Sequence, residues 1–123
     1  MKKLPLLLAL FANAVLAQTA YVTPPGTRKE GDTIDRSHFI YVLHESEPCG
    51  LPIVNARHMR KAEIYNTRKP DIGCWGGTLS ASKGSVVIIG PQGNTSARNL
   101  VDFSKVNFRP DGSVVIIEGW PGL

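Results

Sequence analysis

The chain has 123 residues, a formal net charge of +4 and only two cysteines. This length suits one domain rather than two. Its positive residues are scattered apart from two short runs, residues 57–61 and 68–69. They do not form the basic stripe with interleaved aromatic residues that is typical of nucleic-acid binding, so we expect no nucleic-acid partner.

The first 17 residues have the pattern of a secretory signal peptide. Lys2 and Lys3 form a positive n-region, residues 4–16 form an apolar h-region, and Val15 and Ala17 are small residues suited to a cleavage site. The apolar run is shorter than the about 20 residues needed to span a bilayer. We therefore expect cleavage after Ala17, export to the periplasm or medium, and no stable membrane anchor.

Cleavage would leave 106 residues with a net charge of +2, because Lys2 and Lys3 would be lost. Cys49 and Cys74 would remain, and in an oxidising compartment two cysteines without a third predict one disulfide bond. Closing their 25-residue separation should stabilise the fold by roughly 3–4 kcal/mol. Zinc sites use four ligands at short C-x-x-C or H-x-x-x-H spacing, which is absent, so we expect a structural bond and no cofactor.

Residues 18–35 combine a Pro-Pro-Gly run and mixed charges with little apolar periodicity, which predicts a flexible lead-in. Residues 36–123 are expected to form a single disulfide-stapled domain. Its first strand is predicted over residues 39–44, where residue types enriched in strands alternate along the chain.

Residues 53–64 predict one short helix, because their apolar positions fit helical spacing. The alternative for the end of this segment is a strand that begins at residue 62. A hairpin follows, with residues 75–80 as one arm and 85–89 as the other. Gly84 can adopt the left-handed conformation that such a loop needs.

The sequence Gly-Ser-Val-Val-Ile-Ile occurs twice, at residues 84–89 and 112–117. The second copy follows Arg-Pro-Asp-Gly, a strong reverse-turn signature. Because neither copy alternates with polar residues, both predict strands that are covered on both faces. We expect them to be internal or covered, since such segments aggregate when left at a sheet edge. The repeat reflects either a duplicated hairpin or two strands that use the same β-branched residues.

Residues 80–83 match the S-x-x-K pattern of penicillin-recognising enzymes, but they fall in a hairpin loop without the partner motifs, which predicts a polar turn. His44, Glu47 and His58 are weak candidates for a metal site. A small envelope hydrolase would pair His44 or His58 with Glu45 or Glu47. Because His44 and Glu45 are neighbours in a predicted strand, their side chains should point to opposite faces. We predict no catalytic residue and keep the hydrolase as an alternative.

Two tryptophans and a basic segment are the candidates for partner binding. Trp75 and Trp120 could act as aromatic anchors, which dominate many interfaces. Arg57, Arg60 and Lys61 would form one face of the predicted helix and could meet an acidic partner. The alternatives are that Trp120 caps the core and that the helix face is simply solvated.

A cysteine after a strand, the motif Gly73-Cys74-Trp75 before a hairpin and the run Asp-Phe-Ser-Lys-Val-Asn-Phe together resemble small exported proteins of proteobacteria and their prophages. The resemblance covers residues 43–108 and implies a periplasmic setting, with no functional residues to transfer. We predict an α+β fold, with a small, mainly antiparallel sheet of four to six strands, one short helix and one disulfide. The predicted function is a non-enzymatic interaction protein of the cell envelope, such as an inhibitor or modulator of an envelope component. A structural accessory protein is a further alternative.

Overall fold

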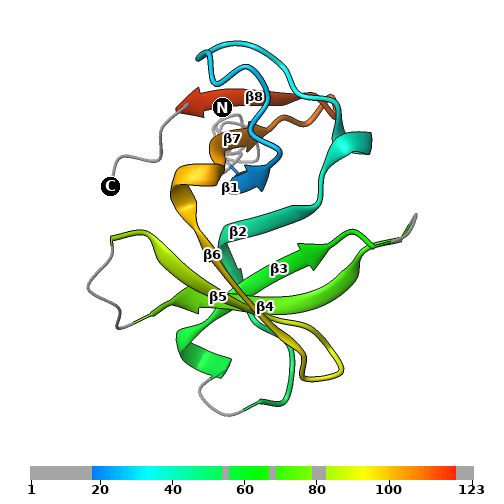
Figure 1. The fold of residues 1–123 in the computed structure, drawn as a ribbon. Coiled ribbons are helices and arrows are strands. Elements are labelled where there is room, and N and C mark those ends of the chain that lie inside the picture. The colour runs from blue at the N-terminus through cyan, green and yellow to red at the C-terminus, as the bar shows by residue number, and fades with distance from the viewer. Residues whose placement is uncertain (1–17, 54–55, 67–68, 79–82, 119–123) are drawn as a thin grey trace, which may run out of the picture.

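The computed structural model describes residues 18–53, 56–66, 69–78 and 83–118. Within them, eight strands form one antiparallel sheet in the order β6-β5-β4-β3-β2-β1-β7-β8 (Figure 1). The strands are β1 (Gln18–Thr23), β2 (Tyr41–Pro48), β3 (Arg60–Ile64), β4 (Asp71–Gly77), β5 (Ser85–Ile89), β6 (Thr95–Asn99), β7 (Ser104–Phe108) and β8 (Val114–Glu118). Single turns of 3-10 helix lie between some of them, namely η2 (Arg36–His38), η3 (Ala56–His58) and η4 (Leu100–Asp102).

The predicted α+β class is wrong, because the sheet has eight strands rather than four to six and the described residues contain no α-helix. The described part of the predicted helix over 53–64 consists mainly of η3 and β3. Ala62 and Ile64 are buried in β3 while Lys61 and Glu63 are partly exposed, which is the two-residue period of a strand. Since β3 pairs with β2 on one side and β4 on the other, this pairing outweighed the helical spacing of the apolar residues.

Residues 18–35 do not form the flexible lead-in that the sequence suggested. Their first six residues are β1, which pairs with both β2 and β7 in the interior of the sheet. Ala20 and Val22 are fully buried. The strand begins at Gln18, the residue after the expected cleavage point. The partners of β1 lie far away in the sequence, so its short apolar alternation could not be distinguished from coil.

The predicted hairpin is confirmed as β4 and β5, which pair antiparallel with Cys74 opposite Ile89 and Gly76 opposite Val87. Its second arm has the predicted bounds, whereas the first lies at Asp71–Gly77 rather than over residues 75–80. The two copies of the repeat form β5 and β8, and each follows a glycine with positive φ, at 82° for Gly84 and 91° for Gly112. Duplication as the origin of this similarity stays a hypothesis.

The expectation that neither copy is left at an open sheet edge is confirmed, but the expectation that both faces of each copy are covered is wrong. In β5 every second residue is buried while Val87 and Ile89 are half-buried, and Ile117 of β8 is 38% exposed. β5 lies between β4 and β6, and β8 lies at the end of the sheet. The free side of β8 is covered by residues 31–34, where the Gly31 and Ile34 amides donate to the Ile116 and Val114 carbonyls at 2.8 and 2.9 Å.

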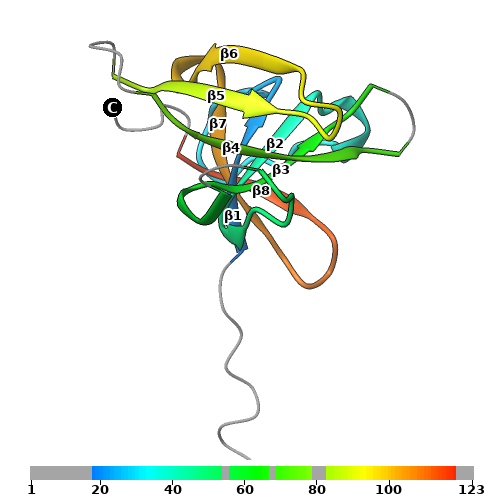
Figure 2. The same ribbon diagram turned by 90° about the horizontal axis from the view of Figure 1, so that it is seen from below.

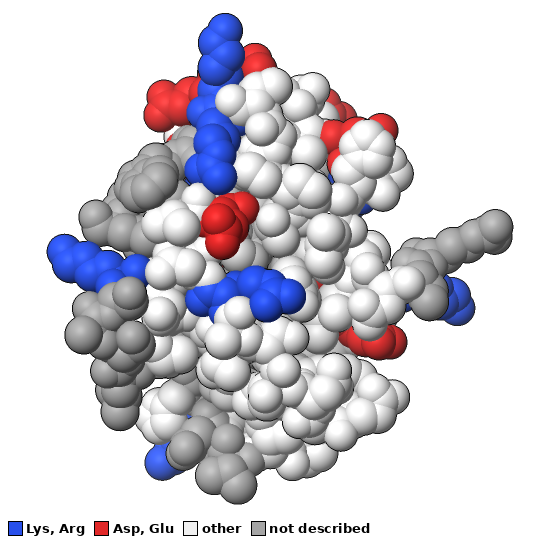
Figure 3. Space-filling view, viewed as in Figure 1, with Lys and Arg blue, Asp and Glu red and all other residues white. Residues whose placement is uncertain are grey.

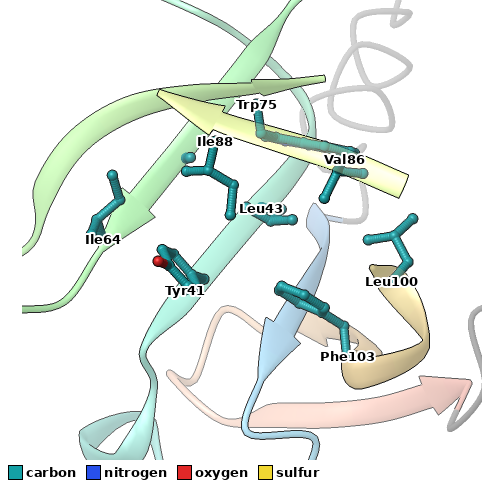
Figure 4. Close-up of a cluster of buried hydrophobic side chains, with 9 residues drawn as sticks. Tyr41, Leu43, Ile64, Trp75, Val86, Ile88, Leu100 and Phe103 are labelled. Carbon is teal, nitrogen blue, oxygen red and sulfur yellow. The ribbon is translucent and has the colours of Figure 1, made fainter. Parts of the chain in front are cut away.

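The sheet bends so that β3 to β6 lie at one end of the molecule and β1, β7 and β8 at the other, with β2 running between them (Figure 1). Figure 2 shows the same arrangement from below, and η4 connects β6 back to β7. The inner face of the bend holds a buried cluster, which Figure 4 shows. It contains Tyr41, Leu43, Ala62, Ile64, Trp75, Val86, Ile88, Leu100 and Phe103.

A second cluster lies on the opposite face of β1, β2, β7 and β8, because successive residues of a strand point to opposite sides. Its members are Ala20, Val22, Phe39, Val42, Val106, Val114 and Ile116. The segment between β1 and β2 covers this face with Phe39 and the half-buried Ile34. The Ser104 hydroxyl also donates to the Pro25 carbonyl of that segment at 2.7 Å. The chain therefore covers one part of its outer sheet face with its own loop.

Candidate functional site

The two cysteines form the predicted disulfide bond between Cys49 and Cys74, with a Cα–Cα distance of 5.2 Å. Cys49 follows β2, and its amide donates to the Met59 carbonyl at 3.2 Å. Cys74 is fully buried in β4. The bond therefore joins the end of β2 to β4, and neither sulfur is available as a thiol nucleophile or metal ligand.

His44, Glu63 and Tyr65 form a hydrogen-bonded cluster on the face opposite the inner cluster. His44 Nε2 lies 2.5 Å from Glu63 Oε2, and the Tyr65 hydroxyl donates to Glu63 Oε1 at 2.5 Å. The side chains of His44 and Glu63 are only 12% and 14% exposed. The His44 ring also stacks on Phe108, with ring centroids 6.0 Å apart.

The protonation states of this cluster follow from its contacts. The hydrogen bond from His44 lowers the pKa of Glu63 although burial opposes it, and the bond from Tyr65 adds to the lowering. Burial, together with the bond to Glu63, raises the pKa of Tyr65 to about 12. At neutral pH, Glu63 is therefore a carboxylate and Tyr65 a neutral phenol. Each Glu63 oxygen accepts one hydrogen bond and the side chain is only 14% exposed, so these contacts hold the carboxylate in a fixed position between His44 and Tyr65.

The residues proposed for metal or acid–base chemistry do not come together. The Glu45 carboxylate accepts a hydrogen bond from Thr19 at 2.6 Å and lies 3.4 Å from Lys105 Nζ. Glu47 pairs with Lys61 at 3.1 Å, and His58 is exposed in η3. The partner of His44 is Glu63 instead.

Among the described residues, no group of three or more His, Cys, Asp or Glu side chains could hold a metal ion. Glu63 and Tyr65 were not predicted as site residues, because residues 53–64 were expected to form a helix and no strand was placed to bring Glu63 beside His44. The alternation of Glu63 and Tyr65 was the available signal, since it places both side chains on one face of a strand.

Trp75, proposed as a surface anchor, lies in the core and is 5% exposed. Its indole N–H donates to the His44 carbonyl at 2.8 Å, and its ring packs edge-on against Tyr21 at 6.0 Å. The Arg60 guanidinium lies 5.7 Å from the Trp75 ring centroid. Trp75 therefore contributes to folding rather than to a binding surface.

The proposed basic helix face is not formed. Arg57 is exposed in η3, whereas Arg60 and Lys61 are consecutive residues of β3 and point to opposite sides of the sheet. Trp120 and residues 80–82 of the S-x-x-K pattern lie outside the described residues, as does the predicted signal peptide. Lys83 is exposed just before β5.

The outer face of β4, β5 and β6 is a feature that sequence reasoning did not find. The strand registers place Ile72, Val87, Ile89, Thr95 and Ala97 on this face, and we name these five residues the outer patch. Ile72 is 40% exposed, Thr95 and Ala97 are exposed, and Val87 and Ile89 are half-buried. In the view of Figure 3, the described surface over the lower half of the molecule is mostly uncharged.

The outer patch contrasts with the outer face at the other end of the sheet. There, residues of the segment between β1 and β2 cover the apolar side chains of β1, β2, β7 and β8. On the outer patch, by contrast, the side chains of Ile72, Thr95 and Ala97 remain exposed to solvent. The outer patch is therefore the candidate functional surface of the described chain.

Comparisons with protein-family models, with curated proteins and with solved structures each give no match to this chain. In the described residues, no helix has both the length and the apolar character needed to cross a membrane.

Proposed function

We propose that this chain is an exported, non-enzymatic binding protein that holds a protein partner of the cell envelope against the outer patch. The observation that carries the proposal is the outward face of three adjacent strands, which presents apolar and uncharged side chains to solvent. Exposed apolar surface on a small protein is typical of interaction sites. Inhibition or modulation of an envelope component is the form of activity that we favour.

Export is supported by the predicted signal peptide and by the disulfide bond. Disulfides persist in the periplasm and outside the cell, whereas cytosolic thiols are kept reduced. The Cys49–Cys74 bond is compatible with such an oxidising setting. The partner is therefore expected among the proteins of the envelope or the surrounding medium.

The contribution of the patch to affinity can be bounded. Complete burial of a Val or Ile side chain contributes about 1.5–3 kcal/mol relative to full exposure. Ile72, Val87 and Ile89 are already partly covered, so completing their burial would contribute about 2–4 kcal/mol in total. This is the scale of a single interface hot spot, so the partner must also contact the polar rim of the patch.

A charge placed on the patch tests the proposal. We expect Val87→Lys to weaken binding of an envelope protein by about tenfold or more, because the ammonium group would be desolvated in the interface. The control is Gln92→Lys, which adds the same charge at an exposed position of the β5–β6 loop. Both variants should keep the far-UV circular dichroism of the parent protein.

The measurement is capture from a periplasmic extract, followed by calorimetry with the purified partner. Loss of binding in Val87→Lys but not in Gln92→Lys would support the outer patch as the binding surface. Equal binding by both variants, or no captured protein with the parent chain, would overturn the proposal.

A further inference from the structure

The two edge strands of the sheet, β8 and β6, differ in whether their outer backbone groups are hydrogen-bonded. The outer side of β8 is hydrogen-bonded to residues 31–34, including a bridge between Thr33 and Val115. β6 pairs only with β5 among the described strands, in a continuous register from Thr95 to Asn99 without a bulge. β6 contains no proline or lysine, and its one inward-pointing charge, Arg98, is held against Tyr41 rather than directed at the open edge.

The backbone groups at this edge can be assigned from neighbouring hydrogen bonds. The Leu100 amide donates to the Gly84 carbonyl at 2.9 Å, and the Gly90 amide donates to the Asn94 carbonyl at 2.8 Å. In an antiparallel pair, residues that exchange hydrogen bonds alternate with residues that do not. The N–H and C=O groups of Thr95, Ala97 and Asn99 therefore point away from β5, toward the open edge.

Arg98 is the one charged residue of β6, and its side chain lies on the inner face. Its guanidinium is 5.4 Å from the Tyr41 ring centroid, and Nη2 donates to the Tyr41 hydroxyl at 3.4 Å. Nη1 donates to the Ala97 carbonyl at 2.8 Å. A carbonyl oxygen can accept a second hydrogen bond, so this contact leaves the Ala97 N–H and one acceptor position for another strand.

We propose that β6 pairs antiparallel with β6 of a second copy of this chain, about a two-fold axis at Ala97. In this register Thr95 faces Asn99 of the second copy, and Ser96 faces its Arg98. The two Arg98 residues do not face each other directly but are diagonal neighbours on the inner face, where each guanidinium lies against Tyr41 of its own copy. A second copy is favoured over an unrelated strand because the edge is self-complementary in this register and because the adjoining outer patch contains no charged residue.

The pairing extends the sheet across both copies and brings the two outer patches together. Directly opposite residues of an antiparallel pair lie on the same face, so Ala97 of each copy would lie side by side on the outer surface. The two patches would then form one continuous uncharged surface with a two-fold axis. The proposed dimer does not depend on the proposed function. The use of this larger surface to bind a partner does rest on the proposed function.

Sedimentation equilibrium of the exported, disulfide-bonded protein tests the dimer. We expect the parent chain to have twice the mass of one chain at high micromolar concentration. Ala97→Pro removes the central edge N–H, and Ala97→Lys adds a charge at the two-fold axis, so both variants should be monomers. Gln92→Lys carries the same added charge away from β6 and should remain dimeric. Far-UV circular dichroism checks that each variant is folded.

Amide hydrogen exchange gives a second and more local measurement. The amides of Thr95, Ala97 and Asn99 should exchange roughly tenfold more slowly in the dimer than in diluted protein. A parent chain that stays monomeric, or an Ala97→Lys variant that still dimerises, would overturn the proposal. Protection that appears only when envelope extract is added to a monomer would assign the edge to a foreign strand and would also overturn it.

The two sets of variants separate the two proposals. A monomeric parent chain whose partner binding is lost in Val87→Lys would refute the dimer alone. A dimer whose partner binding is unchanged in Val87→Lys would refute the proposed function alone.

Discussion

Gly73 lies in β4 beside the Ile89 carbonyl of β5, and replacing it by alanine tests the packing of the two strands. A Cβ atom at this position would overlap the carbonyl oxygen of Ile89 and lie 3.1 Å from Cδ1 of Ile64. Because the overlapping atom belongs to the backbone, a side-chain rotation cannot relieve the contact. The two strands would have to separate locally.

The expected loss of stability follows from this geometry. Overpacking typically costs about 1–3 kcal/mol, and we expect about 3 kcal/mol here because the obstructing backbone atom is held in the sheet. For a domain of about 100 residues, 1 kcal/mol corresponds to about 4–8 °C in Tm. Gly73→Ala should therefore lower Tm by about 12–24 °C.

Gly77 provides a matched control at the end of the same strand. A Cβ atom on Gly77 would meet no heavy atom within 4 Å. Gly77→Ala should be neutral or stabilise the fold by up to about 1 kcal/mol, since alanine lowers the entropy of the unfolded chain. Urea unfolding followed by far-UV circular dichroism measures both variants. The packing argument is refuted if their free energies of unfolding agree within about 0.5 kcal/mol.

Three further predictions concern the disulfide bond and the ionisable cluster. Replacing both Cys49 and Cys74 by serine should lower the free energy of unfolding by roughly 3–4 kcal/mol in urea titrations, and a loss below about 1 kcal/mol would contradict a stabilising role. The pKa of Glu63 is lowered in the fold, so its contribution to stability is present above the ordinary value of 4.5 and is lost as pH falls through the lower folded value. Acid unfolding of Glu63→Gln should therefore depend less on pH below 4.5 than that of the parent protein, and parallel acid-unfolding curves would contradict this. The pKa of Tyr65 is raised from 10.0 to about 12 in the fold. The contribution of the Tyr65 hydroxyl to the free energy of unfolding is therefore complete below pH 10 and declines as pH rises toward 12. Tyr65→Phe should remove part of the alkaline decline between these values, as measured by circular dichroism, and an unchanged decline would argue against the Tyr65–Glu63 bond.

The cluster of His44, Glu63 and Tyr65 shows why the candidate site was only partly predictable. The sequence analysis identified His44 as a residue with potential chemistry and expected Glu45 to point away from it. Glu45 does contact Thr19 and Lys105 instead. The true partner of His44 depends on the pairing of β2 with β3, in which Val42 lies opposite Glu63. A segment assigned to a helix could not supply that partner.

The outer patch was missed for a related reason. The sequence shows that Val87 and Ile89 are apolar, and such residues in an unalternating run were expected to be covered on both faces. The structure gives β5 neighbours on both sides within the sheet but leaves its outward face partly exposed. Residue type indicates that a side chain favours burial, whereas only the arrangement of the layers decides which face is covered.

Sequence alone was sufficient for the disulfide partners and for the β4–β5 hairpin. The first follows from having only two cysteines, and the second from turn chemistry and strand propensity within a short stretch of chain. The place of β1, the strand character of β3 and the exposure of the outer patch were decided by tertiary structure. β1 pairs Gln18 with Phe108 and Ala20 with both His44 and Val106, contacts between residues far apart in the chain. Local periodicity cannot select such pairs, because a strand becomes stable only when its backbone groups find their partners in the assembled sheet.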